Sequence, residues 1–111
     1  MAGQISQEAA QKIQELQILE QTIQNVLLQR QAFLLDLNET NLALEELKTA
    51  GDEVYKIVGQ IMIKASKQET EKDLKSKKEI LELKNKNLEK QEAGFKDKII
   101  RLRDEIISQI G

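Results

Sequence analysis

Apolar residues recur at alternating intervals of three and four along the first half of the chain. One line of positions runs through residues 16, 23, 30, 37 and 44, and a second runs through 19, 26, 33, 40 and 47. Eight of these ten positions are apolar. A coiled-coil seam requires this spacing, because it keeps one apolar stripe facing a partner helix. The pattern predicts a helix over residues 6–50, with Ser6 as its N-cap and Gly51 as its C-terminal stop.

A second seven-residue repeat follows in the last third of the chain. It consists of Leu74, Leu81, Leu88, Phe95 and Leu102. The alternate seam positions 71, 78, 85 and 92 are polar, and only 99 and 106 are apolar. A capping box from Ser66 to Glu69 predicts that this helix covers residues 67–110. Each helix has about 40 residues and is roughly 60 Å long at 1.5 Å per residue.

Arg30 interrupts the apolar seam of the first helix. If the two helices fold back on each other symmetrically, Arg30 lies close to Glu89 or Glu92 of the second helix. We therefore predict an ion pair between Arg30 and one of these carboxylates. Asn85 occupies another seam position, where a polar residue costs stability and fixes the register of the two helices.

Between the two helices the apolar period changes from seven to two. Gly59-Gln60 fits a two-residue type II′ loop, in which Gly holds the first position. In this register Val58 faces Ile61 and Val54 faces Ala65. The resulting β-hairpin, residues 53–65, is apolar on both faces, has unpaired strand edges, and is only marginally stable alone.

A helical pair cannot cover both faces of such a hairpin, whereas several hairpins closing into a barrel can. The predicted fold class is therefore mainly α: a long antiparallel two-helix coiled coil with one central β-hairpin that joins an inter-subunit β-barrel. We expect residues 1–111 to form a single domain. The predicted assembly residues are Val54, Tyr55, Ile57, Val58, Gly59, Ile61, Met62 and Ile63.

Leu28, Leu35 and Leu42 form a further line at seven-residue spacing on another side of the first helix. Such a line indicates contact with a second neighbour. The alternative interpretation is a set of scattered exposed leucines, which are ordinary on protein surfaces.

The composition argues against a compact globule and against catalysis. Charged residues make up 32% of the chain and aromatic residues 3%, with no Pro, which favours long helices over a thick core. The chain has no Cys and no His, so disulfides, thiolate metal sites and the usual general base are excluded. It also has no phosphate-binding loop motif. We expect no enzymatic activity, no cofactor and no metal site.

Nucleic acid and membranes are not expected partners either. The net charge is −2, and the lysines between residues 72 and 90 alternate with acids and lack aromatic neighbours for base stacking. The N-terminus lacks the basic and apolar regions of a signal peptide. No apolar run approaches the roughly 20 residues that span a bilayer. We expect a soluble, cytoplasmic protein that binds or assembles.

The last dozen residues concentrate apolar side chains at the helix end that lies far from the hairpin. Some of them fit the seam, whereas Ile100 and Ile107 point elsewhere. The start of the first helix offers too few and too small apolar residues to cover them all. Surplus apolar surface indicates a binding site for other apolar chains; the alternative is ordinary coil packing with a frayed end. The predicted binding residues are Ile5, Ala9, Ile13, Ile99, Leu102, Ile106, Ile107 and Ile110.

The chain resembles the β-type subunit of prefoldin, a co-chaperone of archaea and eukaryotes. The resemblance rests on Asn38-Glu39-Thr40, on Ala43-Leu44-Glu45-Glu46-Leu47, on the hairpin of residues 54–64, and on Leu88-Glu89-Lys90-Gln91-Glu92. It covers essentially the whole chain. A single hairpin per chain is typical of the β-type subunit, since α-type subunits carry two.

This resemblance implies a hexamer of two α and four β subunits, joined through β-barrels made from the hairpins. It implies that the coiled-coil tips grip unfolded proteins and pass them to a group II chaperonin without ATP. The tip sites on this chain would be the predicted binding residues given above. The alternative function is a structural coiled-coil spacer, or a filament-forming assembly protein, without client binding.

Overall fold

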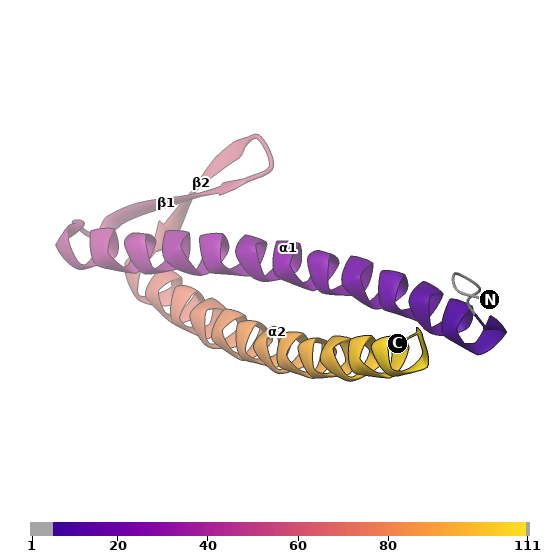
Figure 1. The fold of residues 1–111 in the computed structure, drawn as a ribbon. Coiled ribbons are helices and arrows are strands. Elements are labelled where there is room, and N and C mark those ends of the chain that lie inside the picture. The colour runs from indigo at the N-terminus through magenta and orange to yellow at the C-terminus, as the bar shows by residue number, and fades with distance from the viewer. Residues whose placement is uncertain (1–5, 111) are drawn as a thin grey trace. The chain divides into compact units, whose positions relative to one another are not determined.

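The computed structural model describes residues 6–110 and contains two helices joined by a β-hairpin (Figure 1). Helix α1 spans Gln7–Thr49, strand β1 Glu53–Val58, strand β2 Ile61–Ser66 and helix α2 Lys67–Ile110. The predicted pair of antiparallel helices with a central hairpin is confirmed. None of the helices in the described part of the chain is long and apolar enough to cross a membrane.

The chain divides into two compact units, and each contains a piece of both helices. The first unit comprises Met1–Gln31 and Asn87–Gly111, and we call it the terminal unit. The second comprises Ala32–Lys86 and includes both strands, and we call it the hairpin unit. A single domain over residues 1–111 stays a prediction.

The heptad seam forms the core of the terminal unit. Six side chains from the two helices expose 8% or less of their surface there: Ile23, Val26, Leu88, Ile99, Leu102 and Ile106. Burying a side chain of this size contributes roughly 1.5–3 kcal/mol. The core is thus a narrow stripe along two helices, as the spacing predicted.

The same seam continues in the hairpin unit, where Leu47 and Leu81 are buried. Thr40 is also buried, although it is polar. Its hydroxyl donates a 2.7 Å hydrogen bond to the backbone carbonyl of Asp36, one helical turn earlier. Because this bond satisfies the hydroxyl, a threonine is tolerated at a seam position.

Serine side chains cap both helices at their N-termini. The backbone N–H of Ala9 donates to Ser6 Oγ at 3.0 Å, and that of Glu69 donates to Ser66 Oγ at 3.3 Å. Each bond satisfies one backbone donor that has no partner within its helix. Both predicted N-caps are confirmed.

The predicted stop at Gly51 lies two residues beyond the observed end of α1. Helix α1 ends at Thr49, and Gly59 is the only residue among 6–110 with a positive φ, so Gly51 does not form a left-handed cap. The helix end is instead held by the N–H of Ala50, which donates to the carbonyl of Leu47 at 3.3 Å. Lys67 Nζ then donates to the carbonyl of Ala50 at 2.8 Å.

The hairpin has the predicted register and loop. Val58 pairs with Ile61 and Val54 with Ala65, so residues 59 and 60 form the turn. Gly59 has a φ of 62°, whereas no described residue other than glycine has a positive φ. A type I′ turn requires a positive φ at both loop positions, so this geometry fits type II′.

Candidate functional site

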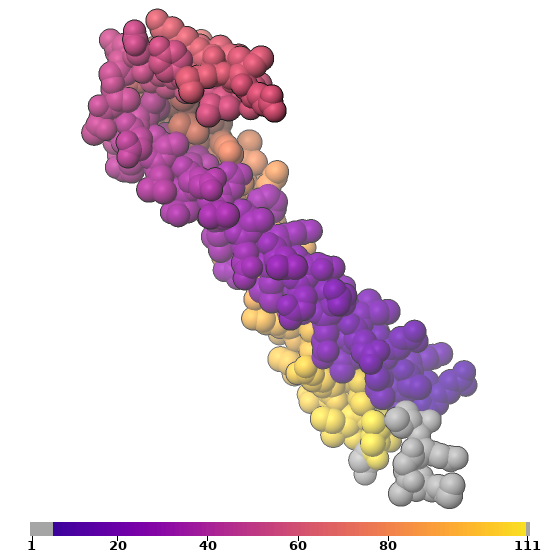
Figure 2. Space-filling view, turned by 90° about the horizontal axis from the view of Figure 1, so that it is seen from above, coloured from indigo at the N-terminus to yellow at the C-terminus, as the bar shows by residue number. Residues whose placement is uncertain are grey.

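The hairpin presents an apolar surface on both faces. Six of its side chains expose between 44% and 72% of their area: Tyr55, Ile57, Val58, Ile61, Met62 and Ile63. The space-filling view shows the hairpin at the surface of its unit (Figure 2). Exposed apolar groups at this density are typical of a surface that binds another protein. The eight predicted assembly residues therefore form one element, although their role in assembly stays a prediction.

A hollow lies at the base of the hairpin, and sequence patterns gave no sign of it. Its volume is about 480 Å³, and residues from α1, β1 and α2 line it, including Leu47, Val54, Tyr55 and Leu74. Three different elements meet here, so a period along one element cannot reveal it. The hollow extends the apolar surface of the hairpin toward the helices.

The predicted binding residues of the terminal unit divide into two groups. Ala9, Ile99, Leu102 and Ile106 are at least 92% buried and belong to the helix seam. Ile107 exposes 67% of its surface and Ile110 exposes 57%. Their neighbour Ile100 also exposes 57%. Ile13 is half-buried. Ile5 lies outside the described residues.

The line of leucines on α1 is exposed throughout. Leu28 belongs to the terminal unit, and Leu35 and Leu42 belong to the hairpin unit. All three expose more than half of their surface. Whether they meet a second neighbour stays a prediction.

The predicted ion pair of Arg30 is confirmed and involves both carboxylates. Arg30 Nη1 donates to Glu92 Oε2 at 2.8 Å, and Nη2 donates to Glu89 Oε1 at 3.0 Å. Lys96 Nζ lies 2.9 Å from the other oxygen of Glu92. The pKa of Glu92 is lowered, and the largest cause is the ammonium of Lys96. Burial raises this pKa, whereas Arg30 lowers it further. Glu92 is therefore ionised within the seam.

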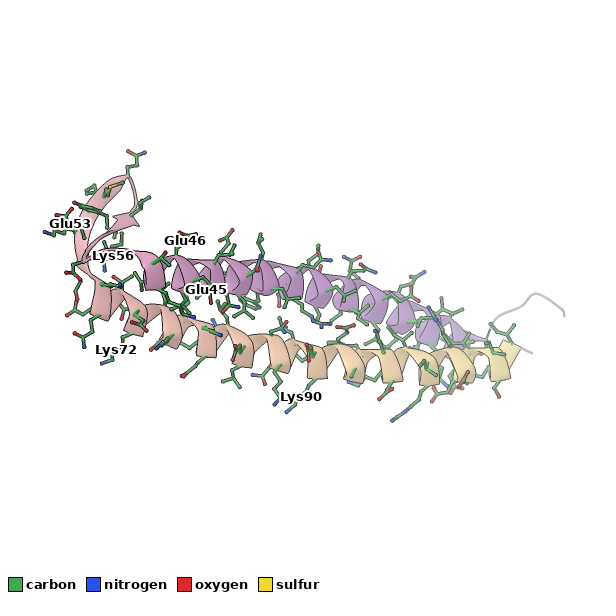
Figure 3. All side chains as sticks on the ribbon, turned by 90° about the vertical axis from the view of Figure 1, so that its left-hand side faces the viewer. Glu45, Glu46, Glu53, Lys56, Lys72 and Lys90 are labelled. Carbon is green, nitrogen blue, oxygen red and sulfur yellow. The ribbon has the colours of Figure 1, made fainter. Side chains whose placement is uncertain are left out.

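The lysine-rich part of α2 forms a mixed, solvated surface. Lys72 and Lys90 point away from α1 within their respective units (Figure 3). Lys75 pairs with Glu71 at 2.9 Å, and Lys77 pairs with Asp36 at 3.0 Å. Because acids neutralise these lysines locally, they form no continuous positive surface. Among residues 6–110, no cluster of three acidic, His or Cys side chains could hold a metal ion.

Comparisons with known proteins identify the family of this chain. The family model for the prefoldin subunit matches residues 10–111. Prefoldin subunit beta of Archaeoglobus fulgidus is 34% identical over 106 residues, which cover 94% of this chain and 91% of that protein. Prefoldin subunit beta of Pyrobaculum neutrophilum is 37% identical over 91 residues, which cover 80% of this chain and 72% of that protein.

The fold agrees as well. The crystal structure of the prefoldin beta subunit from Thermococcus strain KS-1 matches with a TM-score of 0.87 and 32% identity. The match covers 99% of this chain and 97% of that one. Sequence and fold therefore show that this chain belongs to the prefoldin family of non-enzymatic, coiled-coil chaperones, as a β-type subunit.

Proposed function

We propose that this chain is an ATP-independent holdase subunit that captures non-native polypeptides with its terminal unit and passes them to a group II chaperonin. The observation that carries the proposal is the exposure of Ile100, Ile107 and Ile110 on the last turns of α2. Removing apolar surface from water contributes about 25 cal/mol per Å², so these side chains attract the apolar segments that a non-native polypeptide exposes.

The exposed isoleucines make the first contact with a client. Ala9, Ile99, Leu102 and Ile106 are buried in the seam, so they contribute only where the two helices separate. Ile13 is half-buried, so its exposure is intermediate between that of the exposed isoleucines and that of the seam residues. The client-binding surface in this proposal is therefore Ile100, Ile107 and Ile110, with the seam residues as its support.

Membership of the β-type family implies assembly with α-type subunits. We propose that the hairpin joins this chain to an α-type partner and to further β copies in an α2β4 hexamer. The two exposed apolar faces of the hairpin support this, because assembly removes them from water. A hexamer presents several terminal units at once, and multivalency raises the avidity of contacts that are weak one by one.

The alternative function is a structural spacer or filament-forming protein. A spacer needs the buried seam and the hairpin, but it has no use for exposed isoleucines at a helix end. Client capture explains these residues, and a spacer leaves them without a role.

Suppression of aggregation tests the proposal. The assembled protein is mixed with a chemically denatured model enzyme, and light scattering follows the aggregation of the enzyme. We expect Ile100→Ser, Ile107→Ser and Ile110→Ser together to abolish most of the protection. The matched control is Ile80→Ser with Leu83→Ser, since both are exposed apolar residues of α2 in the hairpin unit.

Two results count against capture by the terminal unit. If the triple variant protects as well as the unmodified protein, these isoleucines do not bind clients. If no form of the protein suppresses aggregation, the spacer interpretation holds. Refolding yield with a group II chaperonin present then tests the transfer step separately.

A further inference from the structure

Within the terminal unit, α1 carries a second stripe at three- and four-residue spacing, separate from its seam. We call this stripe the amide face. It consists of Gln14, Gln17, Gln21, Gln24, Leu28 and Gln31, and every one of these residues is exposed. This part of α1 is the indigo helix in Figure 2. A solvent-facing helix stripe ordinarily carries charged and polar residues together, whereas this one carries no charge at all.

Two of the three charged residues of this segment bind α2. Between residues 14 and 31 they are Glu15, Glu20 and Arg30 alone. Glu20 accepts a 3.0 Å hydrogen bond from Arg103 Nη2 on α2. Arg30 donates to two carboxylates of α2, as described above. None of the three belongs to the amide face, which therefore carries no charge of its own.

Glutamine matches the chemistry of a peptide backbone. Its side chain offers two N–H donors and one carbonyl acceptor, the same groups that a peptide bond carries. An extended polypeptide exposes an N–H and a C=O at nearly every residue. A helix satisfies most of these groups internally, so it offers the amides few backbone groups to bind.

A docked helix is also disfavoured by the scarcity of apolar groups. Leu28 is the single apolar residue of the amide face, whereas a coiled-coil seam needs an apolar residue at most positions. Ile18 is exposed beside the stripe, ten residues before Leu28. Ten residues of helix span about 15 Å. An extended chain covers this distance in about five residues, so one short segment can contact both apolar groups and the amides between them.

We propose that the amide face is a second client-binding surface, which holds extended non-native polypeptide through its backbone groups while Ile18 and Leu28 bind its apolar side chains. The proposal rests on the holdase function proposed above and assigns it a further surface. Since the face is neutral, binding there is independent of the charge of the client. Exposed hydrogen bonds compete with water and are individually weak, which allows the client to leave.

The test measures the affinity of the assembled protein for a permanently unfolded, fluorescently labelled polypeptide by anisotropy. The variant carries Gln14→Ala, Gln17→Ala, Gln21→Ala and Gln24→Ala, which preserve neutrality and helix propensity. We expect Kd to rise roughly threefold to tenfold, since each hydrogen bond contributes little alone. The control is Gln91→Ala with Gln109→Ala, because both are exposed glutamines of α2 in the same unit.

A second variant changes the charge of the face without shortening its side chains. Gln17→Glu, Gln21→Glu and Gln24→Glu should weaken binding of an acidic unfolded polypeptide, strengthen binding of a basic one, and make both dependent on salt. Circular dichroism verifies that each variant remains helical. If affinity changes in neither the alanine nor the glutamate variant, the amide face does not bind clients.

The outcomes separate this proposal from the proposed function. If the isoleucine variant loses affinity but both glutamine variants keep it, the amide face is refuted and the holdase function stands. If none of the three variants loses affinity, both proposals are wrong. If the alanine variant instead has a smaller oligomeric mass, the amide face is a contact between copies of this chain and the client proposal is overturned.

Discussion

Arg30 Nη1 of α1 donates a 2.8 Å hydrogen bond to Glu92 Oε2 of α2, a residue 62 positions later in the chain. Both residues occupy seam positions that the heptads reserve for apolar side chains. A charged pair at such a place adds little stability relative to apolar residues, but it penalises every register in which one partner lacks the other. We regard the pair as the feature that fixes the register of the helices in the terminal unit.

Exchange of the charges tests this role. Arg30→Glu should lower the midpoint of thermal unfolding by several degrees, because it places a third carboxylate beside Glu89 and Glu92. Adding Glu92→Arg should restore part of the loss. Thermal circular dichroism of both single variants and the double variant completes a cycle, and additive effects would refute a direct pairing.

The free energy of unfolding should fall in acid because Glu92 becomes protonated. The pKa of Glu92 lies below its ordinary value of 4.5 in the folded chain, through Lys96 first and Arg30 as well. A group with a lowered folded-state pKa stabilises the fold above its unfolded-state pKa, and the contribution is lost as pH falls through the folded value. Urea unfolding should therefore show a decline in stability below about pH 4.5 that is smaller in Glu92→Gln. An identical decline in the variant would exclude Glu92 as its source.

Gly94 lies inside α2 without a packing reason for being glycine. A Cβ at this position meets nothing within 4 Å. Gly94→Ala should therefore raise the free energy of unfolding by about 1 kcal/mol, the difference in helix propensity between the two residues. The expected gain is measurable by urea unfolding, and a loss of stability would show that the glycine is required for packing.

Gly59 is the matched contrast, since it also has open space around its Cα but a φ of +62°. Gly59→Ala should destabilise the hairpin by about 1–2 kcal/mol, because left-handed backbone is unfavourable for residues with a Cβ. The same substitution thus has opposite signs at two glycines, for reasons of backbone conformation alone.

Val58→Asp with Ile61→Asp should leave a smaller assembly with intact helices. These two residues pair across the strands and are both exposed. Charging them opposes their burial against other subunits without removing a contact of the helix seam. Sedimentation gives the mass and far-UV circular dichroism gives the helix content. Gln60→Asp, a loop substitution that removes no apolar group, is the control, and an unchanged mass in the double variant would exclude assembly through this face.

Leu88→Ala and Leu28→Ala compare the seam with the exposed leucine line. Leu88 is buried, so its truncation should cost about 2–5 kcal/mol of stability. Leu28 exposes 63% of its surface, so its truncation should change stability by no more than about 0.5 kcal/mol. Chemical denaturation measures both values, and a large effect at Leu28 would reveal a partner on that side of α1.

Local periodicity predicted the fold well because each element carries its own signal. The heptads defined both seams, and the switch to a period of two defined the hairpin and its loop. Arg30 could be paired with Glu89 and Glu92 because a symmetric fold-back fixes which seam positions are opposite. The stop at Gly51 predicted the end of α1 to within two residues, whereas the contact of Lys67 with that end was not predicted, because it depends on a residue distant in sequence.

The site was predicted less completely, since exposure depends on what a partner helix covers. Ile106 and Ile107 are adjacent in sequence and equally apolar, yet one is buried in the seam and the other is exposed. The hollow at the base of the hairpin depends on three elements meeting. The amide face, apart from Leu28, is a run of polar residues, so hydropathy alone does not distinguish it from an ordinary solvated helix surface.

The hydrogen bond from Lys67 Nζ to the carbonyl of Ala50 has a practical consequence. It joins the first residue of α2 to the end of α1 without involving any residue of the strands. The ends of the two helices are therefore held together at the base of the hairpin by a contact outside the strands. Residues 53–65 can accordingly be exchanged as one segment, provided that Ser66 stays as the N-cap of α2. If assembly runs through the hairpin, as proposed above, strands of another specificity grafted there should direct the same helices into a different assembly.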